Sequence, residues 1–310
     1  MIMHRNDQTL AIRALKSAAP YIRMYKGKTF VVKAGGGVFA DGTATRVLVE
    51  QIAILHYFGV RVVLVHGGGP QLTELSAALG VPTRMVEGRR VTDQQAIDVT
   101  SMVLNGLINT RVLGICRDLN IEAVGISGVD AGLVRAHRRA PMKTGGGEIV
   151  DFGFVGDIDQ VDTSVLKKLL DNGLMPVVSP LSADEAGTLL NINADTVAAA
   201  LGAALGAEKL ILCTGAPGIL GDISDPGSLI SYTDLSGLRR LREEGRIAAG
   251  MLPKAKAIED AIRGGVRRVH VVSYQSPEGI LGEVFTNEGT GTMIVADVNA
   301  LSAAEQQSHS

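Results

Sequence analysis

The chain has 310 residues, of which 46% are hydrophobic and only 4% aromatic, with 38 glycines and no tryptophan. Its 30 Lys and Arg residues nearly balance 32 Asp and Glu, and this net charge of −2 argues against a nucleic-acid partner. A core of Val, Ile, Leu and Ala with many glycines favours an α/β protein with a buried, mainly parallel sheet.

The stretch "TLAIRALKSAAPYIRMYKGK" predicts an N-terminal helix. Ile12, Leu15, Ala19 and Ile22 recur at steps of three and four residues and form one apolar stripe. Pro20 is expected to kink or divide this helix. Two interpretations stay open: the helix packs on its own domain, or it is lent to a neighbouring subunit.

After this helix, apolar strands alternate with helices, which predicts a doubly wound sheet. The predicted strands are residues 29–33, 61–66, 121–126, 175–179, 209–213 and 268–273. A long helical stretch is expected over residues 93–119, and a Gly-rich turn within residues 138–159 predicts a hairpin excursion. The C-terminal "SAAEQQSHS" is expected to fray.

The sequence shows no signal peptide, because "MIMHRNDQTL" lacks an apolar region. No apolar run is expected to reach the length that spans a bilayer. Cys116 and Cys213 lie far apart in apolar stretches, which predicts buried free thiols and a reducing compartment. These observations predict a soluble cytoplasmic protein with no membrane partner.

Several predicted strands end in glycines. The ends read "KAGGG" at 33–37, "HGGGP" at 66–70 and "CTGAPG" at 213–218. Ligands of an open parallel sheet bind beyond the carboxyl ends of its strands, and glycine lets backbone N–H groups approach an anion closely. The two GGG turns therefore predict two phosphate-facing loops, or one for a phosphate and one for a carboxylate.

Two lysines sharpen this prediction. Lys33 ends a buried strand, where its charge needs an anionic partner. Lys254 follows Pro253 at the start of a predicted helix, where a cation opposes the helix dipole and needs another partner too. A shared phosphate would serve both, although simple surface exposure of Lys254 stays an alternative.

Seven motifs in this order resemble the acetylglutamate kinase family of the amino-acid kinase superfamily: "VVKAGGG", "VVLVHGGGPQL", "GRRVTD", "VDFGFVGDI", "NINADT", "GMLPKAKA" and "EVFTNEGTGTMI". The resemblance implies a three-layer α/β/α sandwich with two lobes plus an N-terminal helix. It places an oligomerisation helix at 1–27, an acetylglutamate-binding lobe at 28–182, an ATP-binding lobe at 183–298 and a tail at 299–310.

The resemblance implies transfer of the γ-phosphoryl of MgATP to the side-chain carboxylate of N-acetyl-L-glutamate, the second step of arginine biosynthesis. Its residues fall into four groups. The catalytic ones are Lys33, Lys254 and Asp195; the substrate-binding ones Gly68, Gly69, Arg90 and Asn191; the nucleotide- and phosphate-binding ones Gly35, Gly36, Thr214, Gly215 and Gly218; the effector ones Tyr21, Glu283 and Gly289. No metal ligand is expected from the protein, because Mg²⁺ comes with ATP.

Local sequence offers competitors to two of these roles. An Asp after Asn-Ala at a helix start is typical of an N-cap, and this is the local alternative for Asp195. Arg89 competes with Arg90 as the fork that clamps a carboxylate, but Arg90 directly precedes "VTD" as in the family. Asp93 is expected to cap the following helix.

The chain also departs from the family pattern. Gly37 replaces a common Ser or Asn, Gly215 replaces a common Asp, and "HVVSYQ" from His270 replaces "HIIDGR". The helix before Thr29 resembles that of arginine-inhibited members, which implies a hexamer built as a trimer of dimers and arginine as effector. A nitrogen-signalling protein stays an open question as a further partner. A kinase for carrier-linked aminoadipate or glutamate and a degenerate arginine-binding regulatory domain stay alternatives.

Overall fold

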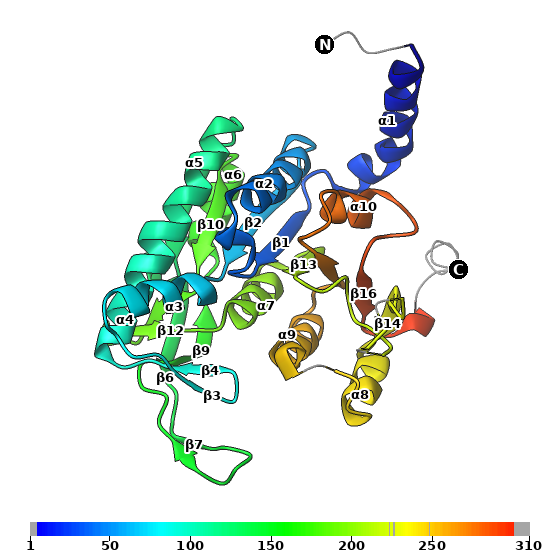
Figure 1. The fold of residues 1–310 in the computed structure, drawn as a ribbon. Helices are drawn as coiled ribbons and strands as arrows, with labels where there is room; N and C mark the ends of the chain where they lie inside the picture. Colours follow the sequence, from blue (N-terminus) through cyan, green and yellow to red (C-terminus); the bar gives the residue numbers. More distant parts are fainter. Residues whose placement is uncertain (1–4, 223, 226, 248, 301–310) are drawn as a thin grey trace.

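The computed structural model describes residues 5–222, 224–225, 227–247 and 249–300 (Figure 1). Its centre is an eight-stranded sheet in the order β14, β16, β15, β13, β1, β2, β10, β5. The strands are β1 Thr29–Ala34, β2 Arg61–His66, β5 Ala123–Ser127, β10 Met175–Ser179, β13 Lys209–Thr214, β14 Tyr232–Asp234, β15 Arg268–Ser273 and β16 Thr292–Val295. Neighbouring strands are parallel except β15 and β16. The six strands predicted from apolar runs are all confirmed, within two residues at their ends.

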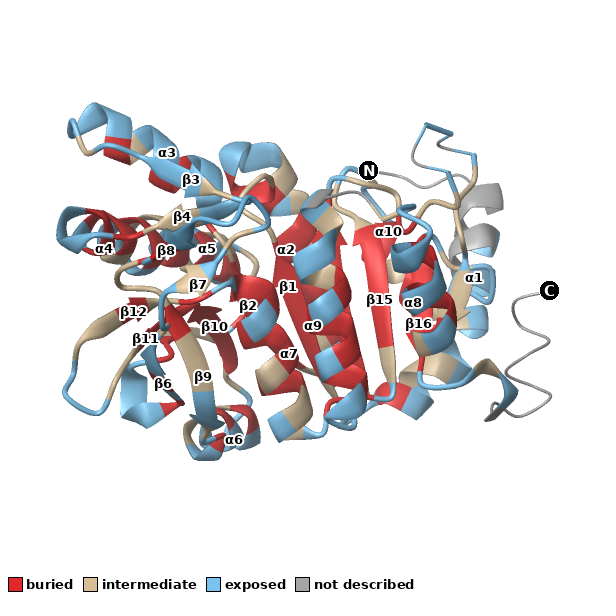
Figure 2. Cartoon of the chain, turned by 90° about the horizontal axis from the view of Figure 1, so that it is seen from below, coloured by how far each residue is buried: buried red, intermediate tan, exposed pale blue. Residues whose placement is uncertain are grey.

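Helices cover both faces of this sheet, so the molecule has the predicted three layers. The helices are α1 Arg5–Tyr25, α2 Gly42–Tyr57, α3 Gly69–Ala78, α4 Gln94–Ser101, α5 Thr110–Asp118, α6 Ser164–Asp171, α7 Ala194–Leu205, α8 Leu235–Glu243, α9 Leu252–Arg263 and α10 Gly279–Phe285. Alternate residues of β1 face opposite layers: Val31 packs with α7 and α9, and Phe30 and Val32 pack with α2 and α10. Figure 2 shows the buried strands β1 and β15 behind α7 and α9.

The helical stretch predicted over 93–119 is interrupted by π-helix. Between α4 and α5 lies η2, Met102–Asn109, which has π-helical hydrogen bonding. From it, Asn109 Nδ2 donates to the carbonyl oxygen of Val177 at 2.9 Å, and Asn105 accepts a hydrogen bond from the Ser179 hydroxyl. A hydrophobic pattern does not separate π- from α-helix, so this difference was not predictable from periodicity.

The run Gln94–Asp118 corrects one expectation. Its 25 residues are long and apolar enough to cross a membrane by length and composition alone, so the prediction that no run reaches that length is wrong by this measure. Such a run is weak evidence for a span, because a core helix of a soluble protein meets the same criterion. Here Val103, Leu104 and Ile108 are buried in the core beside β10 and β5.

A smaller sheet and two hairpins lie beside the central sheet. The smaller sheet has the order β12, β11, β6, β9, with β6 Val134–Arg138, β9 Gly156–Val161, β11 Leu181–Ala183 and β12 Leu189–Asn191. The hairpins are β3 Arg84–Val86 with β4 Arg89–Val91, and β7 Met142–Lys143 with β8 Ile149–Val150. The second hairpin confirms the excursion predicted within 138–159. Glu87 accepts a hydrogen bond from Gly145 N at 2.6 Å and so links the two hairpins.

Helix α1 runs through Pro20 without interruption, so the predicted division does not occur. Its C-terminal end packs on the molecule, where the Tyr25 ring meets Phe30 edge-on at 5.2 Å. Farther from that end, Ile12 and Leu15 are 56% and 58% exposed, and Figure 1 shows α1 projecting from the body. The apolar stripe is therefore exposed at Ile12, Leu15 and Ala19, and only Ile22 near its C-terminal end is half-buried. Residues 1–4 of the predicted helix segment and 301–310 of the predicted tail lie outside the described residues.

Candidate functional site

A buried carboxylate joins two lysines from opposite halves of the chain. Lys33 lies at the end of β1, Asp195 in the first turn of α7 and Lys254 in the first turn of α9. Asp195 Oδ1 lies 2.9 Å from Lys33 Nζ, and Oδ2 accepts a hydrogen bond from Lys254 Nζ at 2.9 Å. The Lys33 contact is close enough for an ion pair but lacks hydrogen-bond geometry at Oδ1, so it is mainly electrostatic.

This cluster carries one more positive charge than negative. Burial favours the neutral form of Asp195, but the ammonium groups of Lys33 and Lys254 outweigh it and hold its pKa below the ordinary value. Burial lowers the pKa of Lys33, while Asp195 counteracts that effect. The side chains of Lys33 and Asp195 are only 5% exposed, and a net positive charge there calls for an anion.

Helix α7 explains why the Asp195 carboxylate is available to the lysines. Asn193 is the N-cap, and its Oδ1 accepts from the backbone N–H groups of Asp195 at 2.7 Å and Thr196 at 3.2 Å. The local alternative for Asp195, an N-cap, is therefore wrong. Asp93 does cap α4 as predicted, since its side chain accepts from Ala96 N.

The two predicted glycine turns touch each other beside the lysines. A Cβ on Gly36 would lie 2.8 Å from Gly69 N, and one on Gly35 would lie 3.7 Å from Lys33 Nζ. A Cβ on Gly68 would collide with Ile108 at 2.6 Å, so this turn packs directly on η2. Gly69 opens α3, whose first N–H groups have no partner within the helix and can bind an anion.

Gln71 adds an unpaired acceptor to these turns. Its Nε2 donates to the Gly36 carbonyl at 2.9 Å, which fixes the amide. Its Oε1 is buried and has no hydrogen-bond partner within the described part of the chain. A buried acceptor of this kind needs a donor from a ligand or a water molecule.

Arg90 contacts the second of these turns, and Asn191 contacts the segment that follows Arg90. The Arg90 guanidinium donates to Thr73 Oγ1 at 2.7 Å and to the Gly69 carbonyl at 3.3 Å, and it forms no ion pair with any described carboxylate. Burial lowers its pKa. Asn191 Nδ2 lies 3.4 Å from Thr92 Oγ1, two residues beyond Arg90. Arg89 instead contacts Met142 Sδ on the second hairpin, which separates it from this site.

The nucleotide side predicted at Thr214, Gly215 and Gly218 adjoins a cavity of about 260 Å³. Thr214 Oγ1 donates to the Ala216 carbonyl at 2.9 Å and closes the turn after β13. The lining is mostly apolar: Ala216, Gly218, Ile219, Leu220, Leu238, Arg246, Ile247, Met251, Ala255 and Ile258. Of these, only Gly218 is among the predicted site residues, because apolar residues such as Leu238 and Ile258 cannot be distinguished in the sequence from ordinary core.

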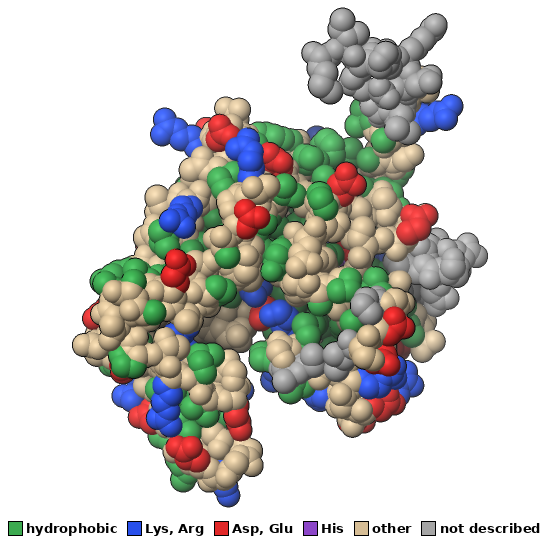
Figure 3. Space-filling model, viewed as in Figure 1, with side chains coloured by type: hydrophobic (Ala, Val, Ile, Leu, Met, Phe, Trp, Pro, Cys, Tyr) green, Lys and Arg blue, Asp and Glu red, His purple; other side chains and the backbone are tan. Residues whose placement is uncertain are grey.

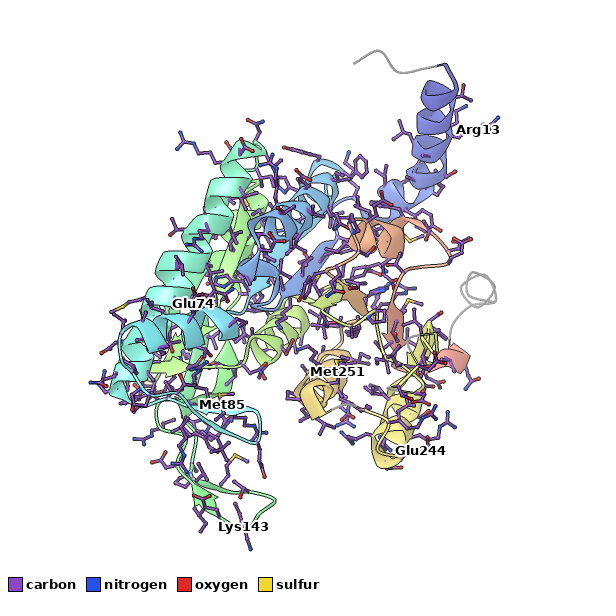
Figure 4. The ribbon with its side chains drawn as sticks, in the orientation of Figure 1. Arg13, Glu74, Met85, Lys143, Glu244 and Met251 are labelled. Carbon is purple, nitrogen blue, oxygen red and sulfur yellow. The ribbon has the colours of Figure 1, made fainter. Side chains whose placement is uncertain are left out.

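The surface is hollowed between these two sides. Figure 3 shows the hollow between the part that carries the β3–β4 and β7–β8 hairpins and the part that carries α8 and α9, with basic and acidic side chains at its inner end. In Figure 4, Met85 and Lys143 lie on the hairpins, and Met251 lies on the other side, just before α9. A ligand in the hollow would contact both halves of the molecule.

The three predicted effector residues also lie close together, away from the lysine pair. The Tyr21 hydroxyl donates to Asn287 Oδ1, and a Cβ on Gly289 would lie 2.8 Å from Glu283 Oε2. Sequence reasoning missed the partners of Glu283. His270 Nδ1 lies 2.7 Å from Glu283 Oε1, and His270 Nε2 lies 2.8 Å from Lys209 Nζ.

Comparison with known proteins defines the class first. The family model described as amino acid kinase family matches residues 28–273. The chain therefore belongs to the amino acid kinase family, and its fold matches carbamate kinase from Giardia lamblia bound to AMP-PNP with a TM-score of 0.63 at 18% identity over 87% of this chain and 99% of that one.

Sequence relatives narrow the class to the acetylglutamate kinases. Acetylglutamate kinase of Myxococcus xanthus is 48% identical over 92% of this chain and 94% of its own, and that of Archaeoglobus fulgidus is 41% identical over 91% and 98%. N-acetylglutamate synthase from Neisseria gonorrhoeae, solved with coenzyme A and N-acetyl-glutamate, has a TM-score of 0.80 at 27% identity over 93% of this chain. This chain spans 64% of that synthase. The chain is thus a member of the acetylglutamate kinase family.

Proposed function

We propose that this chain transfers the γ-phosphoryl group of ATP to the side-chain carboxylate of N-acetyl-L-glutamate. The product is N-acetyl-L-glutamyl 5-phosphate, in the second step of arginine biosynthesis. The single observation that carries the proposal is the pair of ammonium groups, from Lys33 and Lys254, that Asp195 holds beside two glycine turns. The acetylglutamate kinase relatives supply the substrate.

The chemistry needs positioning and charge neutralisation more than proton transfer. The substrate carboxylate is ionised at neutral pH, so it attacks the γ-phosphorus without a general base. Its oxygen forms the new bond while the bond from phosphorus to the β,γ-bridging oxygen breaks, and ADP leaves with that electron pair. Lys33 neutralises the phosphoryl oxygens from one side and Lys254 from the leaving side, while Asp195 keeps both amino groups in place.

The substrate groups follow from the same geometry. Arg90 has no carboxylate partner among the described residues, and its planar fork suits the α-carboxylate of N-acetylglutamate. Asn191 is assigned to the same end of the substrate. The N–H groups of Gly68 and Gly69 are assigned to the reacting carboxylate, and those of Gly35 and Gly36 to phosphate oxygens.

On the nucleotide side, the apolar cavity of about 260 Å³ next to Thr214, Gly215 and Gly218 fits the adenine base. The described residues contain no group of three or more His, Cys, Asp or Glu side chains able to hold a metal ion. We assign the ligands of Mg²⁺ to the ATP phosphates and water, and the ion would neutralise part of the phosphate charge. The unpaired Gln71 Oε1 suits a donor such as a metal-bound water.

A hydroxamate assay tests the function directly. The purified chain is incubated with MgATP, hydroxylamine and either N-acetylglutamate or glutamate. An acyl phosphate reacts with hydroxylamine, so we expect hydroxamate with N-acetylglutamate and much less with glutamate. Absence of hydroxamate with N-acetylglutamate, while ATP binding is intact, would overturn the proposal.

The arrangement also supports two lobes that meet across the hollow, an acetylglutamate lobe at 28–182 and an ATP lobe at 183–298. The proposed boundary falls within β11, which pairs with β12, so a division after Asn191 would keep that pair in one lobe. The free, buried Cys116 and Cys213 fit a reducing cytoplasm.

The exposed stripe of α1 supports an oligomeric role for residues 1–27. Ile12 and Leu15 are more than half exposed, and Figure 4 shows Arg13 pointing away from the body. An apolar stripe of this kind is stable when a neighbouring subunit covers it. We expect a hexamer, in which α1 links dimers. Light scattering on a variant lacking residues 1–25 should show a smaller particle, and an unchanged mass would refute the link.

Arginine is the proposed effector at Tyr21, Glu283 and Gly289. Glu283 already accepts from the N–H groups of Thr290 at 2.7 Å and Gly291 at 2.8 Å, besides its contact with His270. A guanidinium would have to replace one of these partners, which would couple binding to the loop that follows α10. Millimolar arginine should slow the kinase, and an unchanged rate would remove this part of the proposal.

A further inference from the structure

Tyr274 lies at the edge of the sheet where three strand ends meet. It directly follows β15, whose last residue Ser273 pairs with Thr214 of β13, and β13 in turn pairs with β1. The backbone N–H of Tyr274 donates to the Thr214 carbonyl at 2.9 Å. The side chain therefore starts at the edge that carries the glycine turns.

The Tyr274 side chain fills the space beside two glycines at which the chain departs from its family pattern. A Cβ on Gly37 would lie 2.7 Å from the Tyr274 hydroxyl oxygen, closer than any Cβ tolerates. A Cβ on Gly215 would lie 3.5 Å from the same atom. The ring thus extends from the turn after β13 to the turn after β1 and brings its hydroxyl to Gly37.

The Tyr274 hydroxyl can donate a hydrogen bond to the same anion that the backbone N–H groups of the Gly35–Gly37 turn would bind. The carbonyls of Gly35, Gly36 and Gly37 accept from the N–H groups of Val38, Phe39 and Ala40, so this turn has its carbonyls already paired and is left with N–H groups to offer an anion. No hydrogen-bond partner of the Tyr274 hydroxyl is found in the described part of the chain, and the residue is half-buried. A half-buried phenol with an apolar body and an unpaired tip is suited to a ligand.

We propose that Tyr274 is a nucleotide-contacting residue, whose hydroxyl donates a hydrogen bond to a phosphate oxygen held at the turn of Gly35 to Gly37. In this chain the contact stands where the family pattern has side chains at positions 37 and 215. The inference rests on the proposed kinase function, because it takes the phosphate at this turn to be that of ATP.

Removing only the hydroxyl tests the contact. A hydrogen bond to a charged group contributes enough that Tyr274→Phe should weaken ADP binding by roughly 10- to 100-fold. Calorimetric titration of the full chain with ADP and with adenosine separates phosphate from base contacts, so adenosine affinity should stay within about twofold. In steady state the KM for ATP should rise while kcat changes less than about threefold.

Tyr57→Phe is the matched control, because the Tyr57 hydroxyl bonds to the Leu119 carbonyl near the ends of α2 and α5. It should leave ADP binding unchanged. In a second variant, Gly37→Ala places a methyl group against the hydroxyl and should weaken ADP binding in the native chain more than in the Tyr274→Phe background.

The outcomes separate this inference from the proposed function. Native ADP affinity in Tyr274→Phe, or an equal loss for ADP and adenosine, would overturn the role of Tyr274 while the native chain still forms hydroxamate. A native chain that binds ADP but forms no hydroxamate would instead overturn the function, and the ADP titration would still decide the contact.

Discussion

Two buried ionic clusters are built around lysines of neighbouring strands, Lys33 of β1 and Lys209 of β13, and they differ in what completes them. Lys33, Asp195 and Lys254 carry an excess positive charge, and the Lys254 side chain is still 19% exposed. Lys209, His270 and Glu283 are all buried and satisfy one another. The first cluster needs an anion from outside, whereas the second is complete within the chain.

The second cluster is balanced because burial favours the neutral form of His270. Burial lowers the pKa of His270 to about 4 and that of Lys209 to about 7. Burial alone would raise the pKa of Glu283, but hydrogen bonds from His270 and the backbone bring it to about 2. A neutral His270 therefore donates from Nδ1 to Glu283 and accepts at Nε2 from Lys209. The comparison teaches that burial alone does not mark a catalytic lysine; an unbalanced charge beside free backbone donors does.

The largest expected effect comes from removing a lysine of the first cluster. Lys33→Met or Lys254→Met should lower kcat by about 10²- to 10³-fold. Each substitution removes a positive charge that neutralises the negative charge of the transferring phosphoryl group in the transition state. Lys209→Met is the matched variant of the second cluster and should keep kcat within about threefold. Equal losses for Lys33→Met and Lys209→Met would break the distinction between the clusters.

Asp195→Asn should lower the free energy of unfolding by about 3 kcal/mol, since it leaves two buried ammonium groups without a counter-charge. Sulfate or phosphate should restore part of this loss, because an anion can take the vacated role. Urea unfolding with and without 50 mM sulfate, matched for ionic strength with chloride, measures both. A variant as stable as the native chain in chloride would contradict the imbalance.

The second cluster should show itself in the pH dependence of stability. The folded-state pKa of His270 lies near 4, below the ordinary 6.5, so between these values the unfolded chain binds more protons. Stability should therefore fall as the pH falls from 6.5 to 4.5, by about 2 to 3 kcal/mol more than in His270→Gln. Urea unfolding at several pH values measures this difference. If the free energy of unfolding fell equally with pH in both proteins, a neutral buried His270 would be refuted.

The smallest effect is expected at the substrate fork. Arg90→Lys should raise the KM for N-acetylglutamate about tenfold with little change in kcat, because a lysine cannot form the bidentate contact. Arg89→Lys, one residue away and directed at Met142, should change neither constant. Steady-state kinetics with N-acetylglutamate varied distinguishes the two, and a larger effect at Arg89 would reverse the assignment.

Much of the fold could be predicted because its strands are continuous apolar runs bounded by turns. The end of β1 was also readable, since a lysine that closes a buried run and precedes three glycines has few structural uses. The helix 93–119 was predicted as one element, because the π-helical turn of η2 keeps the same apolar spacing.

The remaining features could not be predicted, because they depend on contacts between residues that are far apart in the sequence. Lys209 and His270 lie on adjacent strands 61 residues apart, and nothing local marks them as partners. The nucleotide-side cavity is lined by apolar residues such as Ile219 and Ile258, which are the same residue types as those of the hydrophobic core. Gly37 and Gly215 depart from the family pattern, and only the structure shows that the Tyr274 side chain lies in the space beside both.

The central claim is that Lys33 and Lys254 converge on one phosphoryl group while Asp195 holds them. A crystal structure with ADP, Mg²⁺, N-acetylglutamate and aluminium fluoride tests it most directly. The account predicts a planar aluminium fluoride between ADP and N-acetylglutamate, with the amino groups of Lys33 and Lys254 within hydrogen-bond distance of its fluorine atoms. A bound aluminium fluoride that neither lysine contacts, with both lysines still paired only to Asp195, would contradict the central claim.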